Sequence, residues 1–223
     1  MKSLIVYGAG GLAREVAQLA LDASADGTQL ELVGFLSDDT SVHGTSVAGL
    51  PILGDLSFLR KYPGRFDVAI GVGAPAVKRR LALRAADAAR GFPTLVHPSV
   101  VRSDRIQIGR GVIICAMTVL TVDITIGDFA TINLACTVGH DTVLSNYVTL
   151  APGVNVSGNV HVGTGCDIGT GAKIIQARDL GAWSIVGAGA VVNTDILADS
   201  TSVGVPARCV KQREVGWHLG DEE

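Results

Sequence analysis

The sequence is poor in the residues on which several classes of protein depend. Of its 223 residues only 4% are aromatic and 17% are charged, and the formal net charge of −3 provides no basic excess for binding nucleic acid or an anionic membrane surface. No run of 18 apolar residues is present, so we expect no membrane span. The opening MKSLIVYGAG has an apolar segment too short for a signal peptide.

Cysteine is also scarce, with four residues and no Cys-x-x-Cys pair. Cys115, Cys136, Cys166 and Cys209 match no zinc-ligand spacing with histidine, so we predict no metal site. Cys136 and Cys166 fall at positions where small side chains recur. We interpret all four as reduced packing residues of a cytoplasmic protein.

The dominant pattern is a period of six residues between Ile108 and Val192. Every sixth residue is Ile, Leu or Val, and the next residue is usually small, with Ile175 as an exception. A period of six does not fit a helix of 3.6 residues per turn. It fits a short strand and a tight turn forming one face of a triangular prism, the hexapeptide β-helix. We expect the small residue to lie at the bend between two faces, where a bulky side chain would clash or the backbone φ angle would be positive.

Three such faces make a coil of 18 residues, and neighbouring coils would stack roughly 4.8 Å apart. Residues 18 apart in the sequence therefore share an edge of the prism. This places His140 and Gly158 on one edge, about 5 Å apart, and Thr170 and Ala188 on another. Asp141 follows His140 and is suited to orient its ring and raise its basicity. His140 is thus a candidate general base, and a solvated surface histidine is the alternative.

Residues 1–95 alternate between strand and helix patterns instead. Strands are predicted at 3–7, 30–36, 66–72 and 92–96, and helices at 12–23, 56–61 and 76–90. This alternation predicts a small parallel sheet covered by helices. With a hinge at His97-Pro98, we expect an α/β domain over 1–95, a β-helix over 96–210 and a tail over 211–223.

The loop after the first predicted strand fits a phosphate-binding pattern. Gly8-x-Gly10-x-x-Ala13 follows a strand and opens a helix, whose first N–H groups attract phosphate. Ser37-Asp38 and Gly71 end the next two strands, so they would line one crevice suited to a nucleoside diphosphate. A tight turn without a ligand is an alternative. An NAD site is another, although these residues supply only about half of a dinucleotide-binding fold.

A set of short motifs is spread over nearly the whole chain: Tyr7-Gly8-Ala9-Gly10-Gly11, Phe35 to Asp38, Ala69-Ile70-Gly71, Val96-His97-Pro98-Ser99, Asn133, Gly139-His140-Asp141, Ala151-Pro152-Gly153, Ser157-Gly158-Asn159-Val160 and Gly204-Val205-Pro206-Ala207. Together they resemble the motifs of bacterial nucleotide-sugar N-acetyltransferases of the bacillosamine and perosamine type. This family is related to sialic acid O-acetyltransferases and lies within the hexapeptide-repeat acyltransferases.

The resemblance implies a Rossmann-like domain and a left-handed β-helix that assemble as a homotrimer, with acetyl-CoA bound in a groove between two subunits and no metal. It implies that His140 is the general base and that Asp141 supports it. It also implies two sets of contacts: to the nucleotide sugar from Gly8, Gly10, Gly11, Leu12, Ser37, Asp38, Gly71 and Asn133, and to acetyl-CoA from Thr149, Gly158, Thr170 and Ala188.

The implied reaction moves an acetyl group from acetyl-CoA to the amino group of a UDP- or GDP-linked 4-amino-4,6-dideoxy sugar. Two positions depart from the family, since Leu12 and Thr149 stand where it often has histidines. The departure at Leu12 bears on which sugar is bound more than on the reaction class. The alternatives are sugar O-acetylation of the sialic acid type and a non-enzymatic scaffold that binds NAD or another nucleotide.

Overall fold

The computed structural model describes residues 2–24 and 30–219, and the chain forms two compact units. The first unit comprises Met1–Gly73 and Val77–Pro98, and the second comprises Ala74–Ala76 and Ser99–Glu223. The boundary follows Pro98 rather than residue 95. Strand β24 (Arg208–Gln212) crosses the expected start of a tail at 211, because it pairs with the preceding strand of the second unit. The predicted hinge at His97-Pro98 therefore agrees with the boundary between the units, whereas the expected tail does not begin at a break in the structure.

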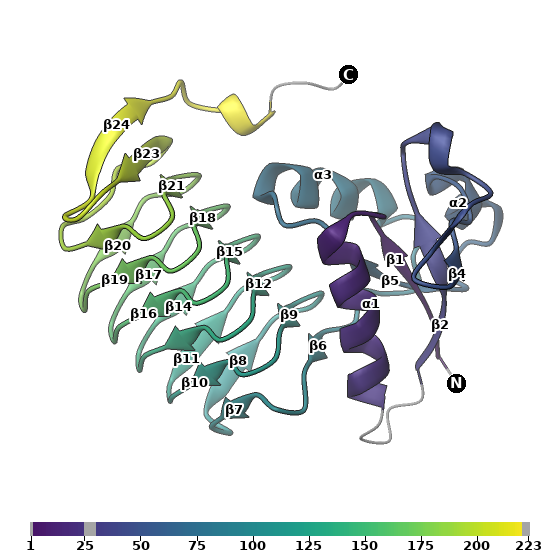
Figure 1. Cartoon of the computed structure of the whole chain (residues 1–223), viewed down its shortest axis with the longest axis horizontal. Helices are drawn as coiled ribbons and strands as arrows, with labels where there is room; N and C mark the ends of the chain where they lie inside the picture. Colours follow the sequence, from purple (N-terminus) through teal and green to yellow (C-terminus); the bar gives the residue numbers. More distant parts are fainter. Residues whose placement is uncertain (1, 25–29, 220–223) are drawn as a thin grey trace. The chain divides into compact units, whose positions relative to one another are not determined.

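The first unit contains a parallel sheet in the order β2-β1-β5 (Figure 1). Its strands are β1 (Lys2–Tyr7), β2 (Leu30–Leu36) and β5 (Asp67–Ile70), and its helices are α1 (Gly11–Ser24), α2 (Leu56–Lys61) and α3 (Pro75–Ala85). Central β1 pairs with both neighbours, Tyr7 opposite Leu36 and Ile70. The carboxyl ends of the three strands therefore meet at one edge of the sheet, as predicted. No helix within 2–24 and 30–219 has the length and hydropathy to cross a membrane.

Part of the predicted secondary structure in this unit is wrong. The third helix ends at Ala85 instead of Arg90, and the chain beyond it is bound to the segment around β5: the Arg90 N–H donates to the Phe66 carbonyl at 2.7 Å, and the Arg90 guanidinium makes two hydrogen bonds to Asp67, at 3.0 and 2.6 Å. Strand β6 (Leu95–Val96) does not join the sheet as a fourth strand. Two further elements of this unit were not predicted: a short helix, η1 (Thr40–Val42), and the hairpin of β3 (Ser46–Val47) and β4 (Leu50–Pro51).

The second unit is a parallel β-helix with three faces (Figure 1). Face 1 contains β7 (Val101–Arg102), β10 (Val119–Leu120), β13 (Thr137–Val138), β16 (Asn155–Val156), β19 (Lys173–Ile174) and β22 (Val191–Val192). Face 2 contains β8 (Ile106–Ile108), β11 (Ile124–Ile126), β14 (Val143–Leu144), β17 (His161–Val162) and β20 (Asp179–Leu180). Face 3 runs through β9 (Ile113–Ile114), β12 (Thr131–Ile132), β15 (Thr149–Leu150), β18 (Asp167–Ile168), β21 (Ile185–Val186), β23 (Ser200–Val203) and β24. A short helix, η2 (Trp217–Leu219), follows.

The predicted register, in which each strand pairs with the strand one coil later, is confirmed on all three faces. Val138 lies opposite Val156, which lies opposite Ile174, and the aliphatic residues of the six-residue period are buried in the shaft except for Ile108, which is half-buried. The register changes only after Val192, where a bridge pairs Leu180 with Ile196, a shorter step than in the preceding coils. The 18-residue spacing therefore predicts correctly which residues lie next to one another in successive coils, throughout the segment that contains His140.

The small residue after each aliphatic residue is required by close approach between coils. A Cβ atom on Gly139 would lie 2.5 Å from the backbone nitrogen of Gly158 and 2.6 Å from the carbonyl carbon of Ser157 in the next coil. Positive φ angles occur two residues later, for example 57° at Asp141 and 56° at Asn159. The clash that we expected at the bend is confirmed, whereas the left-handed backbone lies elsewhere.

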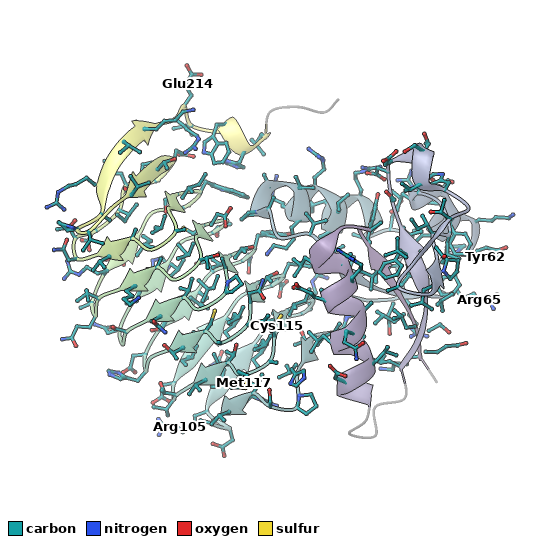
Figure 2. The ribbon with its side chains drawn as sticks, in the orientation of Figure 1. Tyr62, Arg65, Arg105, Cys115, Met117 and Glu214 are labelled. Atoms are coloured by element: carbon teal, nitrogen blue, oxygen red, sulfur yellow. The ribbon has the colours of Figure 1, made fainter. Side chains whose placement is uncertain are left out.

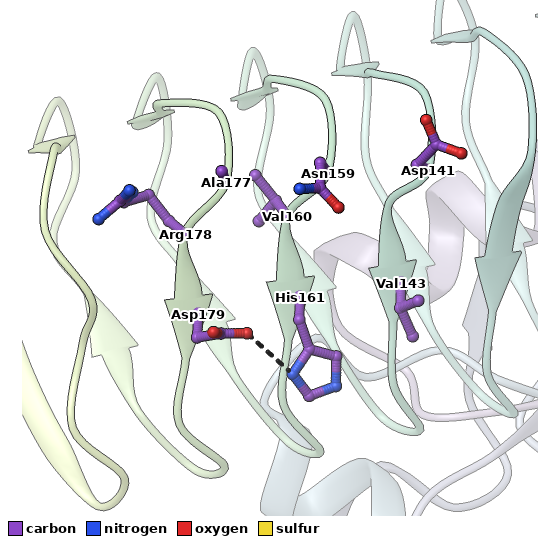
Figure 3. Close-up of a pocket in the computed structure, with 8 residues that line it drawn as sticks. All are labelled: Asp141, Val143, Asn159, Val160, His161, Ala177, Arg178 and Asp179. Atoms are coloured by element: carbon purple, nitrogen blue, oxygen red, sulfur yellow. Dashed lines mark ion pairs between the residues drawn. The ribbon is translucent and has the colours of Figure 1, made fainter.

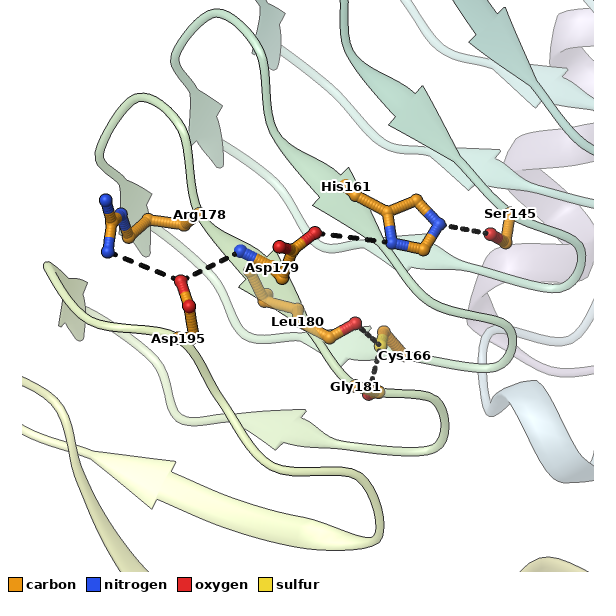
Figure 4. Close-up of polar contacts among 8 residues, drawn as sticks. All are labelled: Ser145, His161, Cys166, Arg178, Asp179, Leu180, Gly181 and Asp195. Carbon is orange, nitrogen blue, oxygen red and sulfur yellow. Dashed lines mark hydrogen bonds and ion pairs between the residues drawn. The ribbon is translucent and has the colours of Figure 1, made fainter.

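Three of the four cysteines are buried packing residues, and all four are free thiols. Burial raises the pKa of Cys136 and of Cys166 to about 11. The Cys166 thiol contacts the carbonyl oxygens of Gly181, at 3.1 Å, and Leu180 (Figure 4), and the side chain of Cys115 is labelled in Figure 2. The packing role is confirmed for Cys115, Cys136 and Cys166 and is wrong for Cys209, which is exposed on β24; the cytoplasmic location stays a prediction.

We expect Gly163→Ala to destabilise the β-helix more than Gly171→Ala. A Cβ on Gly163 would lie 2.6 Å from the Ala182 nitrogen and 2.8 Å from the Leu180 oxygen, so backbone must move, at a cost of about 3 kcal/mol. A Cβ on Gly171 would meet open space, and the φ of Gly171 is +70°. Alanine there would therefore be destabilised only by the left-handed backbone conformation, by about 1 kcal/mol. Urea unfolding of both variants measures the difference, and equal losses would contradict this account.

We expect only Cys209 to react with a thiol reagent in the folded protein at pH 8. It is exposed, whereas Cys115, Cys136 and Cys166 are buried, and the raised pKa keeps the last two thiols protonated. Mass spectrometry after iodoacetamide treatment should find one modification per chain, and four in urea. Rapid modification of a second thiol in the folded state would show that the shaft opens.

Candidate active site

His140 and Asp141 form a hydrogen-bonded pair on the edge between face 1 and face 2. Strand β13 ends at Val138, and the turn that follows carries His140 with its Nδ1 2.8 Å from Asp141 Oδ2. Both side chains are about three-fifths exposed. A carboxylate at Nδ1 favours the tautomer in which Nδ1 is protonated, which makes Nε2 the free acceptor. The pair therefore has the arrangement of a general base and its orienting group.

The imidazole of His140 lies against Gly158, one coil further along the same edge. A Cβ atom on Gly158 would lie 2.6 Å from Cε1 and 2.8 Å from Cδ2 of the ring, so any other residue would displace it. The Gly158 carbonyl accepts a hydrogen bond from Ala177, at 3.1 Å. Gly158 is buried beside the imidazole, and within residues 2–24 and 30–219 no acceptor binds its N–H.

The residues expected to contact acetyl-CoA lie on two edges and one face of the β-helix. Gly158 lies on the His140 edge, and the other three lie elsewhere. Thr170 and Ala188 lie one above the other on the edge between face 3 and face 1. Asn133, the predicted contact of the nucleotide sugar, lies on the same edge. Its side chain accepts a hydrogen bond from the Leu134 N–H at 2.7 Å. Thr149 is buried in β15 of face 3. Face 1 separates these residues from His140, so one chain does not bring the two groups together.

In the first unit, the four predicted glycines have two different roles. A Cβ on Gly8 would lie 2.9 Å from the Gly71 oxygen, and one on Gly71 would lie 2.7 Å from Ala13 Cα, so both glycines permit close packing. Gly10 and Gly11, in contrast, have nothing within 4 Å of an added Cβ. Helix α1 begins at Gly11, and its first N–H groups lie beside this open space. Leu12 packs towards Gly73.

Asp38 is held by two donors at the end of β2. Tyr7 Oη donates to Asp38 Oδ1 at 2.6 Å, and Arg84 Nη1 donates to Oδ2 at 2.6 Å. Burial, and then the hydrogen bond to Asp38, raise the pKa of Tyr7. Ser37 has a local role, since its hydroxyl accepts from the Asp39 N–H at 3.2 Å. Sequence reasoning missed Arg84, because no motif marks a helical arginine as the partner of a carboxylate 46 residues earlier.

Sequence reasoning also missed a groove beside the His140 edge. The groove has a volume of about 230 Å³ and is lined by Asp141, Val143, Asn159, Val160, His161, Ala177, Arg178 and Asp179 (Figure 3). Val143, His161 and Asp179 lie opposite one another on β14, β17 and β20. These three residues are spaced one coil apart in the sequence, and this spacing could have predicted that they lie side by side in the groove. No cluster of three potential metal ligands occurs in the described parts of the chain.

Comparisons with known proteins find a matching family and similar solved structures. A family described as "PglD N-terminal domain" matches residues 3–85. The acetyltransferase domain of PglB from Neisseria gonorrhoeae FA1090 is 34% identical, with a TM-score of 0.86 over 94% of this chain and 100% of that chain, and its structure with acetyl coenzyme A also matches. PerB from Caulobacter crescentus, solved with CoA and GDP-perosamine, is 30% identical, with a TM-score of 0.84 over 95% of this chain and 98% of that chain.

A GDP-perosamine N-acetyltransferase of Escherichia coli O157:H7 is 37% identical over 65 residues, which span 29% of this chain and 29% of that protein. The match to the gonococcal domain, in contrast, includes both units of the fold. The chain therefore belongs to the hexapeptide-repeat family of PglB- and perosamine-type N-acetyltransferases.

Proposed function

We propose that this chain transfers the acetyl group of acetyl-CoA to the amino group of a UDP- or GDP-linked 4-amino-4,6-dideoxy sugar. The observation that carries the proposal is the His140–Asp141 pair, with its free Nε2 beside the free N–H of Gly158. A base next to an oxyanion donor is the minimum that acyl transfer to an amine requires. The relatives solved with acetyl coenzyme A, or with CoA and GDP-perosamine, support the two substrates.

The reaction proceeds by direct attack of the amine on the thioester. His140 Nε2 takes the proton that the nitrogen loses as the new C–N bond forms. The oxygen of the tetrahedral intermediate, which now carries the negative charge, accepts a hydrogen bond from the Gly158 N–H. Collapse of the intermediate breaks the C–S bond, and the departing thiolate takes the proton from the His140 imidazolium. Asp141 keeps Nδ1 protonated and stabilises the cation in between.

The nucleotide is held by the first unit. Gly8 and Gly71 permit the tight turn, and Gly10 and Gly11 leave room for the diphosphate at the N-terminus of α1. Asp38, fixed by Tyr7 and Arg84, faces the nucleoside at the end of β2, next to Ser37. The hydrophobic Leu12 removes one hydrogen-bonding group from this loop, so the sugar phosphate is recognised mainly by backbone N–H groups.

Acetyl-CoA lies along the prism between two chains of a homotrimer. Thr149, Thr170 and Ala188 are separated from His140 by face 1, so they complete the site only when they come from a neighbouring subunit. Asn133, on the same edge as Thr170 and Ala188, contacts the acceptor amine. Sugar O-acetylation would use the same base, and the perosamine-type relatives favour the amine.

We expect His140→Ala to lower turnover by about 10²- to 10⁴-fold, because the attacking nitrogen loses its proton acceptor. Mass spectrometry should detect acetylation of GDP- or UDP-linked 4-amino-4,6-dideoxy sugars by acetyl-CoA with the wild-type protein, and almost none with the variant. Turnover near the wild-type value would overturn the assignment of the base, and absence of acetylation with every amino-sugar nucleotide would overturn the proposed reaction.

Asp123 provides a matched control for the second member of the pair. It lies one coil before Asp141 on the same edge, with nearly the same φ, 55° against 57°, but it pairs with Arg105 instead of a histidine. Asp141→Asn should lower turnover by roughly 10- to 100-fold through the wrong tautomer of His140, and Asp123→Asn should leave turnover unchanged.

We expect the protein to sediment as a trimer at micromolar concentration, since one chain separates the two halves of the site. Analytical ultracentrifugation should give a mass three times that of the chain. A monomer that acetylates the sugar at the full rate would contradict the shared site. Mixing His140→Ala with Thr170→Trp, which blocks the cofactor edge, should restore part of the activity that both variants lack alone.

A further inference from the structure

We propose that the groove beside the His140 edge holds the sugar ring of the acceptor, and that Val143 selects the methyl group of a 6-deoxy sugar. This inference rests on the proposed function, because it places one substrate of that reaction. The groove is formed entirely by residues of the β-helix, so it is a site of the second unit.

The groove begins at the catalytic pair. Asp141, which orients His140, is one of its lining residues, and Asn159 and Ala177 continue the same edge over the next two coils (Figure 3). An acceptor amine that reaches His140 Nε2 therefore belongs to a group lying close to this groove. Its volume of about 230 Å³ is below the roughly 300–1,000 Å³ of sites for drug-sized ligands. That size suits a single sugar ring better than a whole cofactor.

The polar lining matches the hydroxyl groups of a sugar. Asp141 and Asp179 offer carboxylate oxygens, which accept strong hydrogen bonds from hydroxyl groups, and the Asn159 amide both donates and accepts. His161 lies between Ser145, whose hydroxyl is 3.4 Å from Nε2, and Asp179, whose Oδ1 is 3.6 Å from Nδ1 (Figure 4). The Asp179 backbone N–H is bound by Asp195 at 3.1 Å. Polar contacts therefore link the side chains of the lining to one another and to neighbouring residues of the β-helix.

The charges in the groove disfavour a phosphate. Asp141 and Asp179 are opposed by a single cation, Arg178, whose Nη1 lies 3.3 Å from Asp195 and whose Nε donates to the Gln176 carbonyl at 3.3 Å. An anionic diphosphate, from the nucleotide or from CoA, would meet two carboxylates and an arginine that is already paired. A neutral or cationic amino-sugar ring meets no such repulsion.

One large exposed apolar side chain interrupts this polar lining, in addition to the small Ala177. Val143 is 38% exposed, and it lies on β14 next to the turn that carries Asp141. A valine at the end of the groove nearest the base offers a surface for the C6 methyl of a 4-amino-4,6-dideoxy sugar. A hydroxyl at C6 would lose water there without gaining a partner. The methyl group is what distinguishes this sugar from its 6-hydroxy counterpart.

Val143→Thr tests the assignment, because threonine has the shape of valine and adds a hydroxyl. The measurement is the ratio of kcat/KM for a nucleotide-linked 4-amino-4,6-dideoxyhexose to that for the matching 4-amino-4-deoxyhexose. Wild-type protein should prefer the 6-deoxy sugar at least about fourfold, the effect of burying one methyl group. Val143→Thr should remove most of this preference and leave the KM for acetyl-CoA unchanged.

Val119→Thr is the matched control. Val119 is 37% exposed and begins the two-residue strand β10, as Val143 begins β14, but it lies on face 1 outside the groove. It should keep the wild-type ratio. A ratio unchanged by Val143→Thr, in an enzyme that does acetylate the sugar, would overturn the groove assignment alone. Failure of wild-type protein to acetylate any amino-sugar nucleotide would overturn the proposed function as well.

Asp179→Asn gives a second measurement that does not depend on the C6 group. It should raise the KM for the nucleotide sugar several-fold and leave the KM for acetyl-CoA unchanged, since a carboxylate acceptor of a sugar hydroxyl becomes a weaker amide. A rise in the KM for acetyl-CoA instead would place the cofactor in the groove and overturn the proposal. Sedimentation and thermal unfolding of each variant check that assembly and folding are intact.

Discussion

The structure depends on strand pairing that repeats once per coil, without interruption, from the start of the β-helix to Val192. Each coil contacts only the coils beside it, so a constant coil length places chosen residues in columns along an edge or a face. His140 over Gly158 is one such column, and Val143, His161 and Asp179 form another. An insertion of one residue between His140 and Gly158 would separate the imidazole from the free N–H group.

The same backbone conformation serves different purposes on different edges. From Ile114 to Val186, the third residue after each buried aliphatic residue of the six-residue period adopts a left-handed conformation, which costs a residue other than glycine roughly 1–2 kcal/mol. Between faces 2 and 3, this position is occupied by Phe129 and Tyr147, which stack with ring centroids 5.5 Å apart, and by Trp183, which stacks on His218 at 3.7 Å. Packing of large rings offsets the strain there.

On the His140 edge, the left-handed positions are polar or small: Asp123, Asp141, Asn159 and Ala177. Aspartate and asparagine tolerate this conformation better than aromatic residues do. Their side chains stay exposed, so this edge presents hydrogen-bonding groups to a ligand instead of burying rings. The difference between an edge that stabilises the coil and one that carries chemistry is thus a difference in side chains on one backbone.

Sequence reasoning succeeded where a pattern is long and local geometry is constant. The six-residue period predicted the faces, the buried column and the neighbourhood of His140 and Gly158, because each follows from coil length alone. It failed where one side-chain pair sets the outcome. Arg90 binds Asp67 in the segment after α3, and Arg84 binds Asp38 together with Tyr7, and none of these pairs lies at a periodic spacing.

In the reaction that we propose, Asp141 would connect recognition of the acceptor with the chemistry. Its Oδ2 holds Nδ1 of His140, while the residue also lines the groove that we propose for the sugar. A carboxylate has a second oxygen with free lone pairs, so a hydroxyl bound there would not displace the imidazole. It would instead draw negative charge from the carboxylate and weaken its support of the imidazolium. In the reaction that we propose, one carboxylate therefore contacts both the acceptor and the imidazole, and Asp141 couples binding of the sugar to the support of the imidazolium.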